Sequence, residues 1–131
     1  MKLAHAGPAE LRVKNFEASR RFFTETMGLF VADEDSECVY LCAWQDWEHH
    51  TLMLRRGDTS ALEHLGWRVE DAESLEQFAC RFEEAGIAYR WMEAGREKGQ
   101  GKALRFSSPS GIPLELYWEI EKFRTKDPTN Q

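Results

Sequence analysis

Residues 61–86 read ALEHLGWRVEDAESLEQFACRFEEAG and combine a strand with a helix. From Glu63 to Val69, apolar and polar side chains alternate with the period of two that is typical of a β-strand. Asp71 and Ser74 are candidate N-caps, and the apolar side chains that follow them recur at helical spacing. Gly86 is suited to end this helix, because glycine readily adopts the left-handed conformation found there. We therefore expect a strand at Glu63–Val69 and a helix that ends at Gly86.

The order strand, helix and three further strands occurs twice along the chain. In the first half, Asn15 is suited to cap a helix that ends before Gly28. Later strands are predicted at Leu29–Ala32, Val39–Trp44, Thr51–Arg55, Ile87–Met92, Ala103–Ser107 and Ile112–Ile120. Neither helix could bury its apolar stripe alone, so the two βαβββ units must share one fold. We expect one α+β domain over residues 1–120, with modules at about 3–57 and 60–120 in a pseudo-twofold repeat.

The two halves can be aligned residue by residue. Residues 11–13 match 67–69, and Leu52-Met53-Leu54 matches Leu114-Glu115-Leu116. Since side chains alternate along a strand, one face of the sheet is apolar and the other gathers polar groups. This polar face comprises Glu10, Arg12, His49, Met53, Arg55, His64, Arg68, Arg105, Glu115 and Tyr117. We expect a curved sheet that forms a cup around this face, with the helices outside and the arginines paired with Glu10, Glu115 and Glu119.

The composition is that of an ordinary globular domain. The 131 residues include 17 basic and 23 acidic side chains, for a net charge of −6. An acidic chain without a cluster of cations is poorly suited to bind nucleic acid. The chain contains no apolar run long enough for a membrane span and no signal peptide, so we expect a cytoplasmic protein without membrane contact. Its three cysteines are expected to be small buried side chains in a reducing compartment.

Several stretches carry a resemblance to a known family. They are residues 7–13 (GPAELRV), 39–44 (VYLCAW) with Glu48-His49-His50, and 101–106 (GKALRF) with Pro109-Ser110-Gly111 and Glu115-Leu116-Tyr117. With the paired βαβββ units, they resemble the vicinal oxygen chelate superfamily of glyoxalase I, bleomycin-resistance proteins and type I extradiol dioxygenases. The resemblance is strongest to the N-terminal module of catechol 2,3-dioxygenase-like enzymes, and it extends from about Gly7 to Phe123.

The resemblance implies a metal site and also implies that it is incomplete here. In such dioxygenases the C-terminal module holds Fe(II) or Mn(II) through two histidines and one carboxylate. His64 and Glu115 match two of these ligand positions, but the third position is Pro8, which has no donor side chain. His5 lies three residues earlier and out of register, and Met53, at the fourth place used by glyoxalases, offers only a thioether. We expect no tightly bound metal and a polar pair between His64 and Glu115.

Other positions also depart from an active module. His49 matches the histidine that serves as an acid or base in the dioxygenases, and we regard it as a vestigial catalytic candidate. Gln100 and Arg105 stand where the family has a second histidine and a tyrosine. Residues 93–102, which include three glycines, are expected to form a mobile loop. The polar residues 121–131 resemble the start of an interdomain linker.

Three functions remain open at this point. The first is the non-catalytic N-terminal domain of an extradiol ring-cleavage dioxygenase, which acts in aromatic catabolism. Its partner would be the C-terminal catalytic module of the same enzyme or further copies of the chain. The second is a stand-alone dimeric metalloenzyme of the glyoxalase type. The third is a metal-free binding protein of the bleomycin-resistance type, which holds a small aromatic or cationic ligand in the cup, although the numerous arginines argue against a cationic one.

Overall fold

The computed structural model describes residues 2–44 and 48–120 of the chain. Eight strands, two α-helices and one π-helical segment follow one another in this part. They are β1 (Leu3–Val13), α1 (Phe16–Arg21), η1 (Phe22–Thr26), β2 (Phe30–Glu34), β3 (Cys38–Cys42), β4 (Leu52–Arg56), β5 (Ala61–Val69), α2 (Ala72–Ala85), β6 (Tyr89–Met92), β7 (Ala103–Ser107) and β8 (Pro113–Tyr117). The predicted tail at 121–131 lies outside the described residues.

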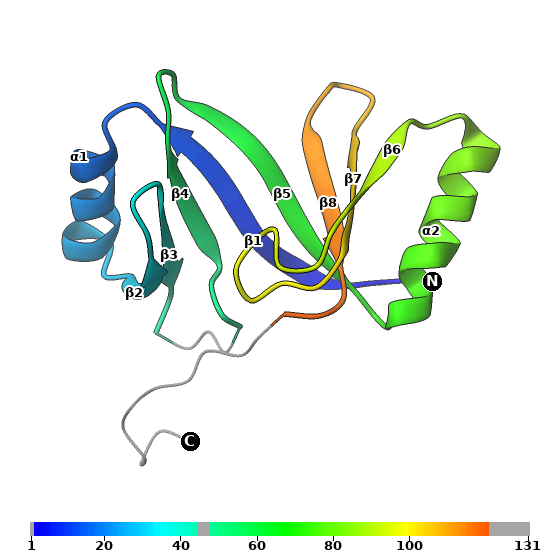
Figure 1. Ribbon diagram of the computed structural model, residues 1–131, viewed down its shortest axis with the longest axis horizontal. Helices are drawn as coiled ribbons and strands as arrows, with labels where there is room; N and C mark the ends of the chain where they lie inside the picture. The colour runs from blue at the N-terminus through cyan, green and yellow to red at the C-terminus, as the bar shows by residue number, and fades with distance from the viewer. Residues whose placement is uncertain (1, 45–47, 121–131) are drawn as a thin grey trace, which may run out of the picture.

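All eight strands form one curved sheet with the order β2-β3-β4-β1-β5-β8-β7-β6. In each module the first strand pairs in parallel with the last, as β1 does with β4 and β5 with β8. The two modules meet where β1 and β5 pair antiparallel at the centre of the sheet. Figure 1 shows the curved sheet with α1 beyond one side and α2 beyond the other. This confirms the predicted α+β fold of two repeated units with the helices outside.

The strand register confirms the predicted alignment of the two halves. Leu11 pairs with Leu54 in the first module, and Trp67 pairs with Leu116 in the second. The alignment matched these same residues, so the repeat extends to individual positions. One step further from the centre, Met53 pairs with Tyr40, and Glu115 pairs with Arg105.

The two helices differ in length and regularity. α2 begins after Asp71, whose side chain accepts a hydrogen bond from the Ser74 backbone amide, and it ends at Gly86 in the left-handed conformation. α1 is capped by Asn15, as predicted, but its regular part is only six residues long. The chain then continues through the π-helical segment η1, which the apolar spacing did not predict.

Each helix covers one end of the outer sheet face with its own apolar core. Under α2, Val69, Leu75, Leu104 and Leu116 are almost fully buried. The core under α1 is built by Val13, Phe16, Val39, Leu41 and Leu54. The core side chains of β4, β5 and β8 are those that strand alternation assigns to the helix side.

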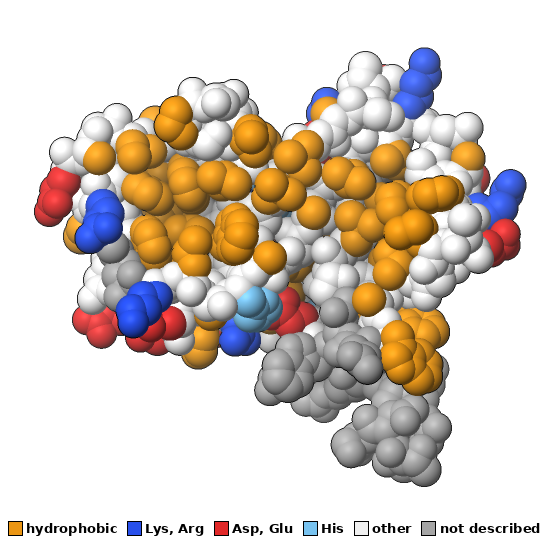
Figure 2. Space-filling model, turned by 180° about the vertical axis from the view of Figure 1, so that it is seen from behind, with side chains coloured by type: hydrophobic (Ala, Val, Ile, Leu, Met, Phe, Trp, Pro, Cys, Tyr) orange, Lys and Arg blue, Asp and Glu red, His pale blue; other side chains and the backbone are white. Residues whose placement is uncertain are grey.

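One face of the molecule exposes apolar side chains. Apolar side chains gather across the middle of the face shown in Figure 2, and large apolar residues that stay exposed include Leu3, Leu65 and Ile112.

The structure tests the predicted burial of the three cysteines. Cys38 and Cys42 are buried as predicted, but Cys80 is exposed on α2, so its predicted burial was wrong. None of the helices in the described ranges is long and apolar enough to cross a bilayer.

Candidate functional site

The inner face of the sheet encloses a polar cavity of about 330 Å³. Its lining is dominated by charged side chains from both modules and from the segment between β6 and β7. They include Glu10, Arg55, Glu97, Gln100, Arg105 and Glu115. This agrees with the polar inner face predicted from strand alternation.

Both predicted metal-ligand residues of the second module lie in the cup. His64 on β5 is 1% exposed and Glu115 on β8 is 2% exposed. The His64 Nε2 atom lies 3.7 Å from Glu115 Oε1, so the two residues approach each other without a short hydrogen bond. The two side chains thus lie within ion-pair distance, while the short hydrogen bonds of Glu115 go to other residues.

Arg105 and Gln100 bind the carboxylate of Glu115. Arg105 donates from Nε (2.9 Å) and Nη2 (2.5 Å) to Oε2, while Gln100 Nε2 donates to Oε1 at 2.6 Å. The same Arg105 Nη2 atom lies 3.2 Å from His64 Nδ1, which accepts its hydrogen bond when the imidazole is neutral. One guanidinium group therefore contacts both residues that match the ligand positions.

The remaining arginines of the inner face pair only partly as predicted. Arg55 Nε donates to Glu10 Oε2 at 2.9 Å, which confirms that pair together with Arg105–Glu115. Arg12 instead binds Glu63 at 2.6 Å. Arg68 lies 4.0 Å from Glu48. The pairing predicted with Glu119 was not observed for these two arginines.

Glu97 is a site residue that the sequence analysis missed. It comes from residues 93–102, and Figure 1 shows this segment reaching across the sheet from β6 and β7 toward the first module. Glu97 is only 7% exposed; its Oε2 lies 2.9 Å from His50 Nε2, and its Oε1 lies 3.4 Å from His64 Nε2. Gly99 packs against His49, where an added Cβ would come within 2.7 Å of the ring.

The prediction of a mobile loop at residues 93–102 did not foresee these buried contacts. The buried glutamate of this segment connects the two modules, because His50 belongs to the first and His64 to the second. No local sequence pattern predicts this contact, because Glu97 and His50 are 47 positions apart in the chain. The local sequence shows only that Glu97 is the single acidic residue between Gly95 and Gly99, which does not indicate a buried position.

The buried charges shift the pKa values of His64 and Glu97 in opposite directions. Burial lowers the pKa of His64, but the hydrogen bond to Glu97 and the charge of Glu115 outweigh burial, and the net change is upward. Burial raises the pKa of Glu97, but hydrogen bonds from His50 and His64 outweigh it and hold the pKa at about 2. Both shifts favour the charged forms, as expected for an ion-pair network.

The first module provides no second imidazole at the position that mirrors His64. Pro8 occupies it, buried at the centre of β1. The nearby histidine, His5, is directed elsewhere: its Nε2 lies 3.0 Å from Glu48 Oε1. Met53 is fully buried and packs with Cys38 and Tyr40.

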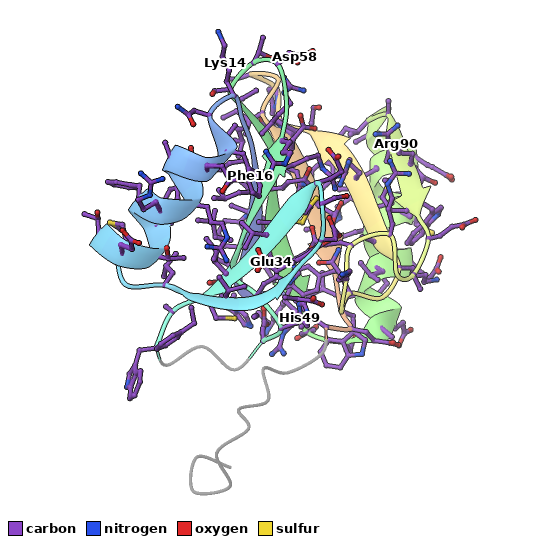
Figure 3. The ribbon with its side chains drawn as sticks, turned by 60° about the vertical axis from the view of Figure 1, so that its left-hand side comes forward. Lys14, Phe16, Glu34, His49, Asp58 and Arg90 are labelled. Carbon is purple, nitrogen blue, oxygen red and sulfur yellow. The ribbon has the colours of Figure 1, made fainter. Side chains whose placement is uncertain are left out.

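His49, the vestigial catalytic candidate, lies at one end of the sheet. Figure 3 shows it at the end opposite to Lys14 and Asp58, close to β2. Its Nδ1 lies 2.9 Å from the Nδ1 of His50, and its Nε2 lies 3.5 Å from Asp33 Oδ2. Within the described ranges, the residues that line the cavity do not include His49.

A second buried polar group lies beside the cup, around Glu48. Tyr117 on β8 donates its hydroxyl to Glu48 Oε2 at 2.9 Å. Burial raises the pKa of Tyr117, and the neighbouring Glu48 carboxylate raises it further, so the phenol stays protonated. The ring of Tyr117 packs directly on Gly7, where a side chain would collide with it.

The donor set can be tested against a metal of the extradiol type. Glu10, His64 and Glu97 each offer one ligand atom, and these atoms lie within 4.8 Å of one another. However, Arg55 binds Glu10, His50 binds Glu97, and a second imidazole is lacking where Pro8 stands. The residues therefore do not fit an open centre of two histidines and one carboxylate. The arrangement is an ion-pair network.

Comparisons with known proteins agree with the fold. The profile of the catechol 2,3-dioxygenase-like N-terminal domain matches residues 62–121. The chain is 41% identical over 121 residues to a manganese-dependent 2,3-dihydroxybiphenyl 1,2-dioxygenase of Geobacillus genomosp. 3. It is 32% identical over 123 residues to a metapyrocatechase of Geobacillus stearothermophilus. These alignments cover 92% and 94% of this chain.

A solved structure gives the same result in three dimensions. Homoprotocatechuate 2,3-dioxygenase from Brevibacterium fuscum superposes with a TM-score of 0.89 at 31% identity, over 94% of this chain and 39% of the enzyme chain. The chain likewise spans only 38% and 36% of the two Geobacillus relatives. The chain thus belongs to the vicinal oxygen chelate superfamily and is like the N-terminal domain of the extradiol dioxygenases.

Proposed function

We propose that this chain is the non-catalytic N-terminal domain of an extradiol ring-cleavage dioxygenase. In that enzyme, a further domain would bind Fe(II) or Mn(II) and cleave a catechol-type ring with O2 in the breakdown of aromatic compounds. The observation that carries the proposal is Pro8, because it removes a metal ligand from the inner face of the cup. The relatives support it, since each is more than twice as long as the matched region.

The residues of this domain would then stabilise the fold and form contacts with a neighbouring domain. The network around Glu97 and Glu115 ties both modules and the β6–β7 segment into one body. The apolar side chains across the face in Figure 2 are of the kind that a neighbouring domain or a further copy covers. We infer that the catalytic domain of the same enzyme is the main partner of this surface, and that His49 has no role in proton transfer.

The alternatives left open by the sequence have weaker support. A stand-alone metalloenzyme would need a third donor from a second copy of the chain. A binding protein for an aromatic ligand would need an apolar cavity, whereas this one presents buried carboxylates that a plain ring would leave without partners.

A metal-loading experiment tests the proposal. The purified chain is incubated anaerobically with Fe(II) or Mn(II), desalted, and assayed for metal content and for ring cleavage of catechol and 2,3-dihydroxybiphenyl. We expect far less than one metal ion per chain and no ring-opened product. The double variant P8H/R105Y, which restores a donor at the vacant position, is expected to retain more iron. Stoichiometric metal with turnover in the unmodified chain would refute the proposal.

A further inference from the structure

The second module places a cation between the two residues that match metal-ligand positions. Arg105 Nη2 lies 2.5 Å from Glu115 Oε2 and 3.2 Å from His64 Nδ1. Gln100 takes the other carboxylate oxygen of Glu115 at 2.6 Å. Both oxygens of Glu115 are thus already bound, and a positive charge lies beside the imidazole. A metal ion would have to displace these donors and approach a guanidinium at close range.

The charge balance of the cluster points the same way. Three buried carboxylates, Glu10, Glu97 and Glu115, each lie within 3.7 Å of a ring nitrogen of His64. Buried carboxylates need compensation by cations or by hydrogen bonds, because isolated buried charge is strongly unfavourable. Arg105 supplies such a cation on Glu115 and Arg55 supplies one on Glu10, while Glu97 is held by His50 and His64. In metal-binding sites the ion itself has this role.

We propose that Arg105 is a built-in replacement for the metal ion and keeps this cup closed to divalent cations. Arginine is suited to the role, since its guanidinium stays charged and its planar group can bind a carboxylate through two nitrogens. The side chain of Arg105 is 19% exposed, so most of it is shielded from solvent. Neutralising this one residue should open a latent site formed by His64, Glu115 and a neighbouring carboxylate.

Two matched variants separate charge from size. R105Q removes the charge and keeps a side chain that can donate to Glu115, whereas R105K keeps the charge. Each variant, with the unmodified chain, is titrated with Mn²⁺ and with Zn²⁺ by calorimetry, and its melting temperature is measured with the metal and with EDTA. We expect R105Q to bind Zn²⁺ at least about tenfold more tightly than the unmodified chain. Its melting temperature should rise by about 4 °C with the metal. R105K should behave like the unmodified chain.

Further variants identify the ligands of the new site. The gain in R105Q should be lost in R105Q/H64A and in R105Q/E115Q. The control R55Q removes the same kind of charge from Glu10 without touching Glu115, and should gain little affinity. If R105Q does not fold in EDTA, it is refolded with and without Zn²⁺, and recovery of the native circular dichroism spectrum is compared.

The outcomes separate this inference from the proposed function. A folded R105Q without metal binding would overturn the inference, and so would equal gains in R105Q and R105K or His64-dependent binding by the unmodified chain. Failure of R105Q to gain metal would leave the non-catalytic assignment intact. Ring cleavage by the unmodified chain would refute the proposed function instead.

Discussion

The two modules share one backbone plan but differ in the chemistry of their inner faces. In the first module, Met53 and Tyr40 pair across β4 and β3 and pack with Cys38 in an apolar cluster. In the second, Glu115 and Arg105 occupy the corresponding places and form a buried ion pair. The same register thus supports an apolar contact on one side and a charged contact on the other.

This difference separates what the fold requires from what the site requires. The outer faces of both modules need apolar residues such as Leu54 and Leu116, because the helices pack there. The inner faces are not constrained in this way, and a few side chains determine whether they are polar. A βαβββ unit can therefore lose or change a metal site without losing its architecture.

The largest predicted effect comes from breaking the ion pair of the second module. Glu115→Met alone leaves Arg105 without its carboxylate, and we expect a loss of about 4 kcal/mol in unfolding free energy. The double variant E115M/R105Y copies the Met53–Tyr40 pair and should recover at least half of that loss. Urea unfolding followed by tryptophan fluorescence provides the free energies for a double-mutant cycle. A double variant no more stable than E115M would contradict the equivalence of the two pairs.

The next effect concerns the contact that links the modules through Glu97. The pKa of this residue is lowered from 4.5 to about 2, so its ionised form stabilises the fold above pH 4.5. As the pH falls from 4.5 toward 2, the unfolded chain takes up a proton that the folded chain does not. This should cost about 3 kcal/mol of stability.

The control for this pH dependence is E97Q, which cannot titrate at this position. Its stability should fall less steeply than that of the unmodified chain in the same range, and the two curves should converge near pH 2. His64 is protonated throughout this range in both the folded and the unfolded chain, so it does not interfere. Parallel curves for both proteins would mean that Glu97 is not held ionised by the two histidines.

Much of this architecture was predictable from local patterns. Strand alternation and helical spacing identified both units, and the matched triplets at 52–54 and 114–116 predicted the register. The caps at Asn15 and Asp71 and the end at Gly86 follow from the conformations that these residues favour. The inner position of His64 and Glu115 follows from alternation alone.

The remainder depends on contacts between residues distant in the sequence. Glu97 gains its role only when the β6–β7 segment reaches His50, and nothing near it in the sequence encodes that approach. The π-helical end of α1 is a similar case, since the apolar spacing there is also compatible with a regular helix. Arg105 was recognised as a departure from the family, but its position between His64 and Glu115 required the side-chain geometry.

A smaller effect is expected at Gly66, the partner of Glu115 across the parallel strands. The corresponding residue in the first module is Glu10, which pairs with Met53 and carries a full side chain. An added Cβ at Gly66 would come within 2.6 Å of the Pro8 carbonyl oxygen. Gly66→Ala should therefore cost about 2 kcal/mol, because backbone must shift.

The control is Gly111→Ala, which meets no neighbour but has a φ of 82°. It should cost about 1 kcal/mol through its backbone conformation alone. Chemical denaturation of both variants gives the comparison. If Gly66→Ala were the milder change, the central seam between β1 and β5 would be more adaptable than the structure indicates.

The smallest predicted effects compare the two helix caps. Asp71 accepts hydrogen bonds from the backbone nitrogen and the hydroxyl of Ser74, at 2.9 and 2.8 Å. Asn15 accepts one from the Ala18 nitrogen at 3.3 Å. Asp71→Ala should cost about 1 kcal/mol and Asn15→Ala about half as much, which thermal unfolding can resolve. A larger effect of Asn15→Ala would show that the shorter helix depends more on its cap.

The central position of β1 has a consequence for how the protein is made. Residues 9–13 of this eleven-residue strand pair with β4 on one edge, and residues 3–12 pair with β5 on the other. In a nascent chain that has completed only the first module, one edge of its longest strand therefore has unpaired backbone groups. Such an edge can form hydrogen bonds with other chains and promote aggregation. The second module shields that edge, and two fragments divided between residues 57 and 60 would each expose the surface that the other needs.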